Sequence, residues 1–129
     1  MTNALPLPAV PALRATATVY GLAAVDTRGR VADQITVRAL GWAPGTRLNL
    51  HEAQGLLVIQ PDPEGVSIVG GQGYLRLPAP VRHWFGLVPG DRVLLVADPA
   101  RGRLVVHPPS SLDALISECH TRLLGGEPA

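Results

Sequence analysis

The side chains of this chain best suited to specific chemistry are its arginines. Eleven positions carry lysine or arginine, and all of them are arginine. The planar guanidinium group holds five donors in a fixed fork that fits phosphate oxygens and base edges. Basic residues gather in two stretches, each with one acid: Arg28, Arg30 and Arg38, then Arg76, Arg82, His83 and Arg92. The pattern suits a phosphate-bearing partner, and an ordinary solvated surface is the alternative that composition alone leaves open.

Other kinds of chemistry find less support in the sequence. The four histidines do not have the spacing of metal ligands, and Cys119 and His120 are adjacent, so they point to different sides of a helix. The glycines within residues 70–73 are followed by neither a long helix nor a Lys-Ser/Thr pair, which argues against a phosphate loop. No serine lies in a glycine elbow. We therefore predict no catalytic residue, no metal and no cofactor, and we predict that the chain is not an enzyme.

Length and composition limit the architecture to one domain or two very small ones. The chain has 129 residues, of which 47% are hydrophobic, so a core can form. No run of eighteen apolar residues is present, which predicts no membrane span. A single cysteine allows no internal disulfide, and the N-terminus lacks the pattern of a secretory signal, so we predict a cytoplasmic protein. The proline-rich residues 1–15 are predicted to form a flexible tail.

The chain matches itself over two stretches, residues 16–63 and residues 64–109. Glycines, prolines and arginines recur in the same order in both. The matched segments are Gly29 with Gly73, Val37-Arg38 with Val81-Arg82, Leu40-Gly41 with Phe85-Gly86, Ala43-Pro44-Gly45 with Val88-Pro89-Gly90, and residues 55–61 with residues 102–108. Chance similarity between apolar segments would not keep glycines and prolines in order, so we infer an internal duplication.

Each copy is predicted to form the same β-β-α-β-β unit. In the second copy, Pro78 and Pro80 fit the first turn of a short helix, and Gly86 fits the left-handed residue that ends it. In the first copy, Asp33 is the expected N-cap and Gly41 is the expected terminal glycine.

One such unit is too small to fold alone, because its short strands expose open edges and only half a core. Two units facing each other close a barrel and remove those edges. The predicted fold is therefore mainly β, a barrel formed by both copies within one chain, and an exchange of copies between two chains is the competing arrangement. Trp42 and Trp84, at the ends of the two short helices, are expected to anchor in the core.

A C-terminal amphipathic α-helix is predicted over residues 110–126. A serine is its expected N-cap, Asp113 lies in the first turn and Arg122 in the last. Apolar residues recur at helical spacing along one face: Leu112, Leu115, Ile116, Cys119 and Leu123. This face either packs on the barrel or pairs with a second subunit, and we predict a homodimer held by it.

The tandem pattern resembles the AbrB/MazE/SpoVT swapped-hairpin family over about residues 18–109. The second copy carries the resemblance through Gly73-Tyr74-Leu75-Arg76-Leu77-Pro78, Val81-Arg82-His83, Phe85-Gly86, Gly90-Asp91 and Leu104-Val105-Val106. The first copy carries it through residues 25–31, Val37-Arg38, Leu40-Gly41 and Gly45, and it lacks the proline before the helix. The resemblance implies β-β-α-β-β units that interleave into a barrel.

The resemblance also implies a DNA-binding transcriptional regulator that contacts double-stranded DNA through arginines. Carried onto this chain, the implied contact residues are Arg28, Arg30, Arg38, Arg76, Arg82 and His83. Arg76 stands where the family usually has an apolar residue, and Tyr74 matches Arg30, so the two halves of the DNA face are expected to differ. Clustered arginines neutralise phosphates and release counterions, which agrees with this implication.

Two other functions stay open at this point. MazE-type antitoxins resemble the chain in having an extension after the barrel, so an antitoxin-like protein that binds a toxin partner is the runner-up. The extension here is short and partly apolar, where an acidic tail would be expected. A barrel kept only for assembly is the third possibility, because the net charge is +1.

Overall fold

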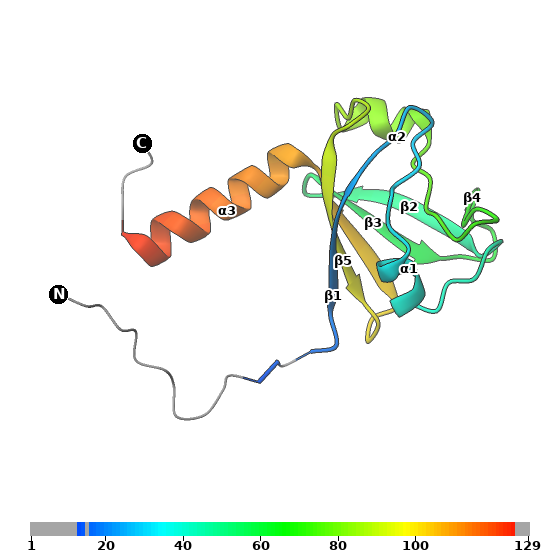
Figure 1. The fold of residues 1–129 in the computed structure, drawn as a ribbon, viewed down its shortest axis with the longest axis horizontal. Coiled ribbons are helices and arrows are strands. Elements are labelled where there is room, and N and C mark those ends of the chain that lie inside the picture. Colours follow the sequence, from blue (N-terminus) through cyan, green and yellow to red (C-terminus); the bar gives the residue numbers. More distant parts are fainter. Residues whose placement is uncertain (1–12, 15, 126–129) are drawn as a thin grey trace.

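The computed structural model describes residues 13–14 and 16–125 of the chain (Figure 1). Residues 1–12, residue 15 and residues 126–129 lie outside the described residues. The predicted flexible tail falls almost wholly in that part, as does the last residue of the predicted C-terminal helix.

The described residues form a single antiparallel sheet and three helices. The strands are β1 (Val19–Ala24), β2 (Arg47–Ala53), β3 (Leu56–Pro61), β4 (Ser67–Ile68), β5 (Arg92–Asp98) and β6 (Arg103–His107). The helices are α1 (Ile35–Ala39), α2 (Ala79–Trp84) and α3 (Pro109–Leu124). Mainly β structure with a C-terminal helix was predicted, and the structure confirms both.

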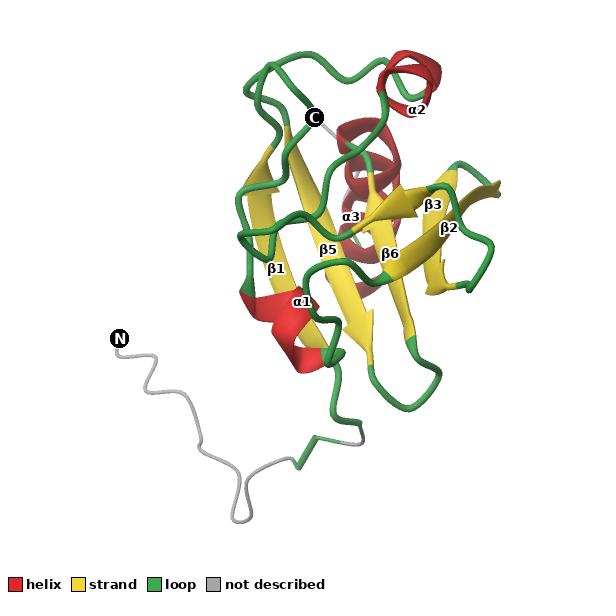
Figure 2. Cartoon of the chain, turned by 90° about the vertical axis from the view of Figure 1, so that its right-hand side faces the viewer, coloured by secondary structure: helices red, strands yellow, loops and turns green. Residues whose placement is uncertain are grey.

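The sheet has the strand order β1-β5-β6-β3-β2-β4 and curls into a half-barrel (Figure 2). The first strand of each predicted copy pairs with the third strand of the other copy, so that β1 pairs with β5 and β4 pairs with β2. Among the described residues, β1 and β4 stand at the two edges of the sheet and are not paired with each other, so the structure shows a half-barrel and does not confirm the predicted closed barrel of two repeats.

The open side of the half-barrel is covered by two irregular segments, residues 25–34 and residues 69–78. Each was expected to hold a second strand, and each holds only isolated bridges, Val25 with Val31 and Arg30 with Arg76. Glycines with positive φ, Gly29 at 86° and Gly73 at 83°, turn the chain before a ladder can extend. The two segments meet through backbone hydrogen bonds, from Val31 N to the Leu75 carbonyl oxygen at 2.9 Å and from Leu77 N to the Gly29 carbonyl oxygen at 2.8 Å.

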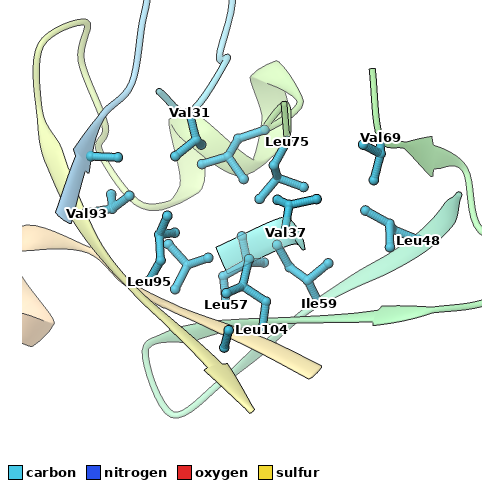
Figure 3. Packing of buried hydrophobic residues seen from close by; sticks show 14 of the residues in the cluster. Val31, Val37, Leu48, Leu57, Ile59, Val69, Leu75, Val93, Leu95 and Leu104 are labelled. Carbon is cyan, nitrogen blue, oxygen red and sulfur yellow. The ribbon is translucent and has the colours of Figure 1, made fainter. Parts of the chain in front are cut away.

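The core lies between the concave face of the sheet and these two segments. In β5 every second residue is buried, which is the period of a strand with one face inward. Figure 3 shows Val31 and Leu75 facing Leu57 and Leu104 across the core, and all four side chains are at most 2% exposed. Burying each such side chain contributes about 1.5–3 kcal/mol. The two covering segments are therefore held in place by the core and not by a ladder.

The two short helices end in the same way. Gly41 and Gly86 adopt positive φ, and the residue after each donates its backbone N–H five positions back, from Trp42 to Val37 at 3.2 Å and from Leu87 to Arg82 at 2.8 Å. The predicted terminal glycines are thus confirmed.

The starts of these helices also agree with the sequence. The N-cap position of α1 is Gln34, one residue after the predicted Asp33, but Asp33 supplies the capping bond, because its Oδ2 accepts a hydrogen bond from Thr36 N at 2.9 Å. Pro78 and Pro80 lie at the start of α2, as predicted. Trp42 is buried in the core, but Trp84 is 68% exposed and stacks on Phe85 at 6.0 Å, so its expected anchoring was wrong. The helix α2 has no buried residue, which leaves no core position for a tryptophan at its last residue.

The helix α3 follows β6 directly, contacts β5 and β6, and then projects away from the sheet (Figure 1). It begins at Pro109 after Pro108, without a side-chain cap, so the expected serine cap was wrong. Proline at the first helical position replaces a donor that would otherwise be unsatisfied. Gly125, with φ of 64°, ends the helix. No helix within the described residues is long and apolar enough to cross a membrane.

Candidate nucleic-acid interface

The candidate site begins with a tight turn between the two halves of the first covering segment. The Asp26 carboxylate accepts hydrogen bonds from the backbone N–H groups of Arg28 at 2.9 Å and Arg30 at 2.8 Å. These backbone donors, with the neighbouring Arg30 guanidinium, lower the pKa of Asp26 below its usual value. The carboxylate stays ionised at neutral pH and fixes the direction in which Arg28 and Arg30 leave the backbone.

Gly29 allows this turn to lie close against the second covering segment. A Cβ at this position would stand 2.2 Å from the Leu77 carbonyl oxygen and 2.8 Å from Arg82 Nε. The backbone of the turn can therefore approach Leu77 only because residue 29 has no side chain.

Alternation along the two covering segments separates core residues from charged residues. Arg30 and Arg76 are exposed, whereas Val31, Leu75 and Leu77 are buried. Because neighbouring side chains of an extended chain point to opposite sides, the residues beside the buried ones must face solvent. Arg30 and Arg76 are partners in an isolated antiparallel bridge, which brings two basic residues from distant parts of the sequence side by side.

The side chains of this region are ordered by contacts with one another. Arg76 Nε donates a hydrogen bond to the carbonyl oxygen of Arg28 at 2.8 Å. The Arg30 guanidinium lies 4.8 Å from the centre of the Tyr74 ring, within the range of a cation–π contact. It also pairs with Asp26, with 3.2 Å between Nε and Oδ2. Tyr74, the residue that matches Arg30 in the predicted duplication, thus contacts the Arg30 guanidinium.

These residues line an open groove of about 500 Å³. Its walls are the turn at residues 26–30 and the loop and bridge at residues 70–76, with Arg28, Arg30 and Arg76 as its basic side chains. Three guanidinium groups face one carboxylate, so the groove carries a net positive charge. Such a groove can hold the phosphate groups of a nucleic acid backbone.

Arg82 is engaged differently from the three groove arginines. It lies on α2, partly buried, and its Nε donates to the Leu77 carbonyl oxygen at 3.0 Å. One of its terminal nitrogens donates to the Thr27 carbonyl oxygen at 3.3 Å. The side chain thus ties α2 to the turn at residues 26–30, and its geometry is that of a positioning residue.

Arg38 and His83 lie outside the groove. Arg38 is exposed on α1, where it donates to Gln34 Oε1 at 3.3 Å, and it borders a second hollow of about 400 Å³. Gly71 and Gln72 line both hollows, so the loop at residues 70–73 separates Arg38 from the groove. His83 is exposed on α2. Contact of these two residues with DNA stays a prediction.

Sequence reasoning did not select Asp26 or Gln72. Gln72 accepts a hydrogen bond from Gln34 Nε2 through its carbonyl oxygen at 2.7 Å and so fixes the loop to the first covering segment. An aspartate three residues before a glycine is a recognisable turn signal for Asp26. No comparable local signal points to Gln72.

The residues expected to hold a homodimer lie along α3. Leu115, Ile116 and Leu123 are exposed, and Leu112 and Cys119 are partly buried. Within residues 13–14 and 16–125, no group of three or more histidine, cysteine or acidic side chains could hold a metal ion.

No family model, no curated protein and no solved structure matches this chain. The resemblance stated above therefore rests on the chain's own residues and their spacing.

Proposed function

We propose that the chain is a DNA-binding transcriptional regulator of the AbrB-like type, which contacts double-stranded DNA through the groove that Arg28, Arg30 and Arg76 line. The observation that carries the proposal is the convergence of these three arginines. They come from two segments more than forty residues apart in sequence, since 48 positions separate Arg28 from Arg76. Arginines that served only as solvated surface residues would not need to converge from two distant segments.

The strand order supports the finer fold proposal, a swapped-hairpin barrel of two β-β-α-β-β repeats. Read from either edge, the sheet gives the same succession: the first strand of one copy, followed by the third and fourth strands of the other copy. The central pair, β6 with β3, joins the two fourth strands. On the other side of the core, Arg30 and Arg76 bridge the two covering segments.

The groove residues suit two parts of DNA recognition. A guanidinium group can neutralise a phosphate, and its fork can bind the O6 and N7 atoms of a guanine in the major groove. Tyr74 occupies the place that Arg30 holds in the first copy, so the two halves of the surface present different groups. We expect the preferred DNA site to lack perfect twofold symmetry.

Binding to genomic DNA fragments tests this proposal. Fluorescence anisotropy at low and moderate salt should give affinity that falls as salt rises, because phosphate contacts release counterions. The variant Arg30→Ala/Arg76→Ala should weaken binding and reduce the slope of log affinity against log salt by about two.

The matched control removes the same charge elsewhere. Arg14 and Arg101 are exposed and lie near the end of the β1–β5 pair at which Val19 pairs with Ala97. The turn at residues 26–30 follows the opposite end of this pair, where Val25 N donates to the Asp91 carbonyl oxygen. Arg14→Ala/Arg101→Ala should leave the slope close to that of the wild type. Equal slopes for the two double variants would place the DNA contact elsewhere, and an absence of salt-sensitive binding in the wild type would contradict the function itself.

A further inference from the structure

The helix α3 is poorly suited to stand in water alone. It has sixteen residues, and its sequence PSSLDALISECHTRLL is rich in residues of low helix propensity such as serine, threonine, cysteine, histidine and aspartate. Isolated helices of about this length are marginal in water even when they are rich in alanine. Its first turn follows β6 directly, but none of its residues is buried. The helix therefore needs a further packing surface.

The apolar face of α3 has the spacing of a coiled-coil seam. Leu112, Ile116, Cys119 and Leu123 follow one another at intervals of four, three and four residues, the alternation of d and a positions in a heptad. Leu112 and Cys119 are partly buried, Ile116 is 44% exposed, and Leu123, at the far end of the helix, is 70% exposed. The part of the seam furthest from the sheet is thus the most open to a partner.

We propose that α3 pairs in antiparallel orientation with α3 of a second copy of this chain. In an antiparallel pair, a positions of one helix meet d positions of the other. If the twofold axis of the pair passes between residues 117 and 118, Leu112 lies opposite the partner's Leu123 and Ile116 lies opposite the partner's Cys119. Twofold symmetry repeats both layers, so all four seam residues of each helix are covered. This inference goes beyond the DNA-binding function and does not depend on it.

The charges beside the seam select this orientation and this occupant. Asp113 and His120 stand seven residues apart on one edge of the seam, at e positions. Antiparallel helices bring equivalent edges together, so each Asp113 lies near the partner's His120, whose imidazole can donate to the carboxylate. In a parallel pair, e positions face the partner's g positions, so Asp113 would meet the partner's Pro108 and His120 would meet the partner's Leu115, and neither pair joins an acid to a donor. The helix carries the acids Asp113 and Glu118 and the base Arg122, so its charges are mixed. A mixed surface suits pairing with a second copy better than pairing with a strongly acidic or strongly basic partner.

The sheet supplies a continuation of the same interface. Outward-facing residues of three adjacent strands form a row where α3 begins, because Leu22 pairs with Leu94 and Leu94 pairs with His107. Leu22 is 54% exposed. The antiparallel arrangement carries the partner's Leu123 to the first turn of α3, beside this row. The partner can therefore cover apolar side chains of the sheet as well as the seam.

Sedimentation equilibrium of the full chain tests the pairing. We expect the wild type to have the mass of a dimer and Ile116→Glu to have the mass of a monomer, because a carboxylate cannot be buried in the central layer. Ser117→Glu is the matched control, since Ser117 is exposed on the other side of the helix, and it should stay a dimer. Circular dichroism should show the β spectrum in both variants. A monomeric wild type, a dimeric Ile116→Glu, or a monomeric Ser117→Glu would overturn the proposal.

Disulfide formation tests the orientation. The variant Ile116→Cys/Cys119→Ser carries one thiol at residue 116, and the wild type carries one at Cys119. In the antiparallel pair these two thiols share a layer, so mild oxidation of an equal mixture should give a linked heterodimer. Each protein oxidised alone should link poorly, because like positions are offset by three residues, about 4.5 Å along the axis. Linkage of each protein alone without linkage in the mixture would show a parallel pair, and linkage in none would place the seam elsewhere.

Discussion

Arg76 Nε donates a hydrogen bond to the carbonyl oxygen of Arg28 at 2.8 Å, although 48 residues separate them in the sequence. The bond joins the bridge residue of the second covering segment to the tip of the turn in the first. The side chain of Arg76 is thus oriented by the backbone of Arg28, another arginine of the groove. The basic groove is therefore set by the packing of the two segments against each other, and its arrangement depends on both halves of the chain.

The first prediction separates the charge of Arg76 from its geometry. Arg76→Lys keeps the positive charge but loses the Nε donor and the planar fork. We expect the salt slope of DNA binding to stay near its wild-type value, while the preference for a specific fragment over random DNA falls about tenfold. Arg101→Lys, on the β5–β6 hairpin, should change neither quantity. A steep fall in the salt slope with Arg76→Lys would show that the hydrogen bond to Arg28, and not the charge, supports the groove.

The second prediction concerns the close approach at Gly29. Gly29→Ala places a Cβ 2.2 Å from the Leu77 carbonyl oxygen and forces a side chain onto a residue with φ of 86°. We expect the free energy of unfolding to fall by roughly 3 kcal/mol, because strain at positive φ and displacement of the backbone add together. Gly102 has φ of 62°, and no described atom outside its chain neighbours lies within 4 Å of the point that a Cβ would occupy, so Gly102→Ala should cost only about 1 kcal/mol. Urea denaturation of both variants measures the difference, and equal losses would refute the argument from crowding.

The parts of this fold that could be predicted from the sequence are those with local signals. Gly41 and Gly86, each followed by an apolar residue, indicated the ends of α1 and α2, because a helix terminus depends on a few neighbouring residues. Pro78 indicated the start of α2 for the same reason. The alternating stretch RLNLHE and the apolar stretches LLVI, RVLLVA and LVV likewise lie in β2, β3, β5 and β6.

The parts that could not be predicted depend on contacts between distant segments. The reduction of the expected second strands to single bridges follows from where Gly29 and Gly73 bring the chain, which only the folded arrangement shows. The resemblance implied that Arg82 contacts DNA, but the Thr27 carbonyl oxygen to which its side chain donates lies 55 residues away, which no local pattern indicates. The exposure of Trp84 likewise follows from the shallow packing of α2, which no local pattern encodes.

The third prediction is a pH dependence of stability from His107. Its Nδ1 is buried without a hydrogen-bond partner among the described residues, and burial lowers the pKa of His107 below 6.5. Between the lowered folded-state pKa and about 6.5, the unfolded chain binds more protons than the folded one, so stability rises with pH across this window and levels off above it. The free energy of unfolding should therefore be lower at a pH of about 5 than at about 7.5.

Two histidine variants check the assignment. His107→Gln should flatten this part of the pH profile of the unfolding free energy. His83→Gln, on the exposed surface of α2, should leave the profile as it is in the wild type. A profile that persists in His107→Gln would assign the pH dependence to another group.

The last prediction concerns Arg82, which the family resemblance places at the DNA and the structure ties to backbone oxygens. Arg82→Ala removes the bonds to the Leu77 and Thr27 carbonyl oxygens, and we expect it to lower the free energy of unfolding by about 1–2 kcal/mol, in the range of hydrogen bonds made by charged groups. Arg38 is the matched control, because it holds the corresponding position in the first copy and bonds only to Gln34 of its own segment among the described residues. Arg38→Ala should change stability by less than about 0.5 kcal/mol.

DNA binding by the same pair of variants separates positioning from direct contact. If Arg82 acts by holding the turn at residues 26–30, Arg82→Ala should weaken binding while the salt slope stays near its wild-type value, because no phosphate contact is lost. Arg82→Lys should not restore the affinity, since a single ammonium cannot reach two carbonyl oxygens with the geometry of the guanidinium fork. A slope reduced by about one in Arg82→Ala, and recovered in Arg82→Lys, would instead show that Arg82 binds a phosphate directly.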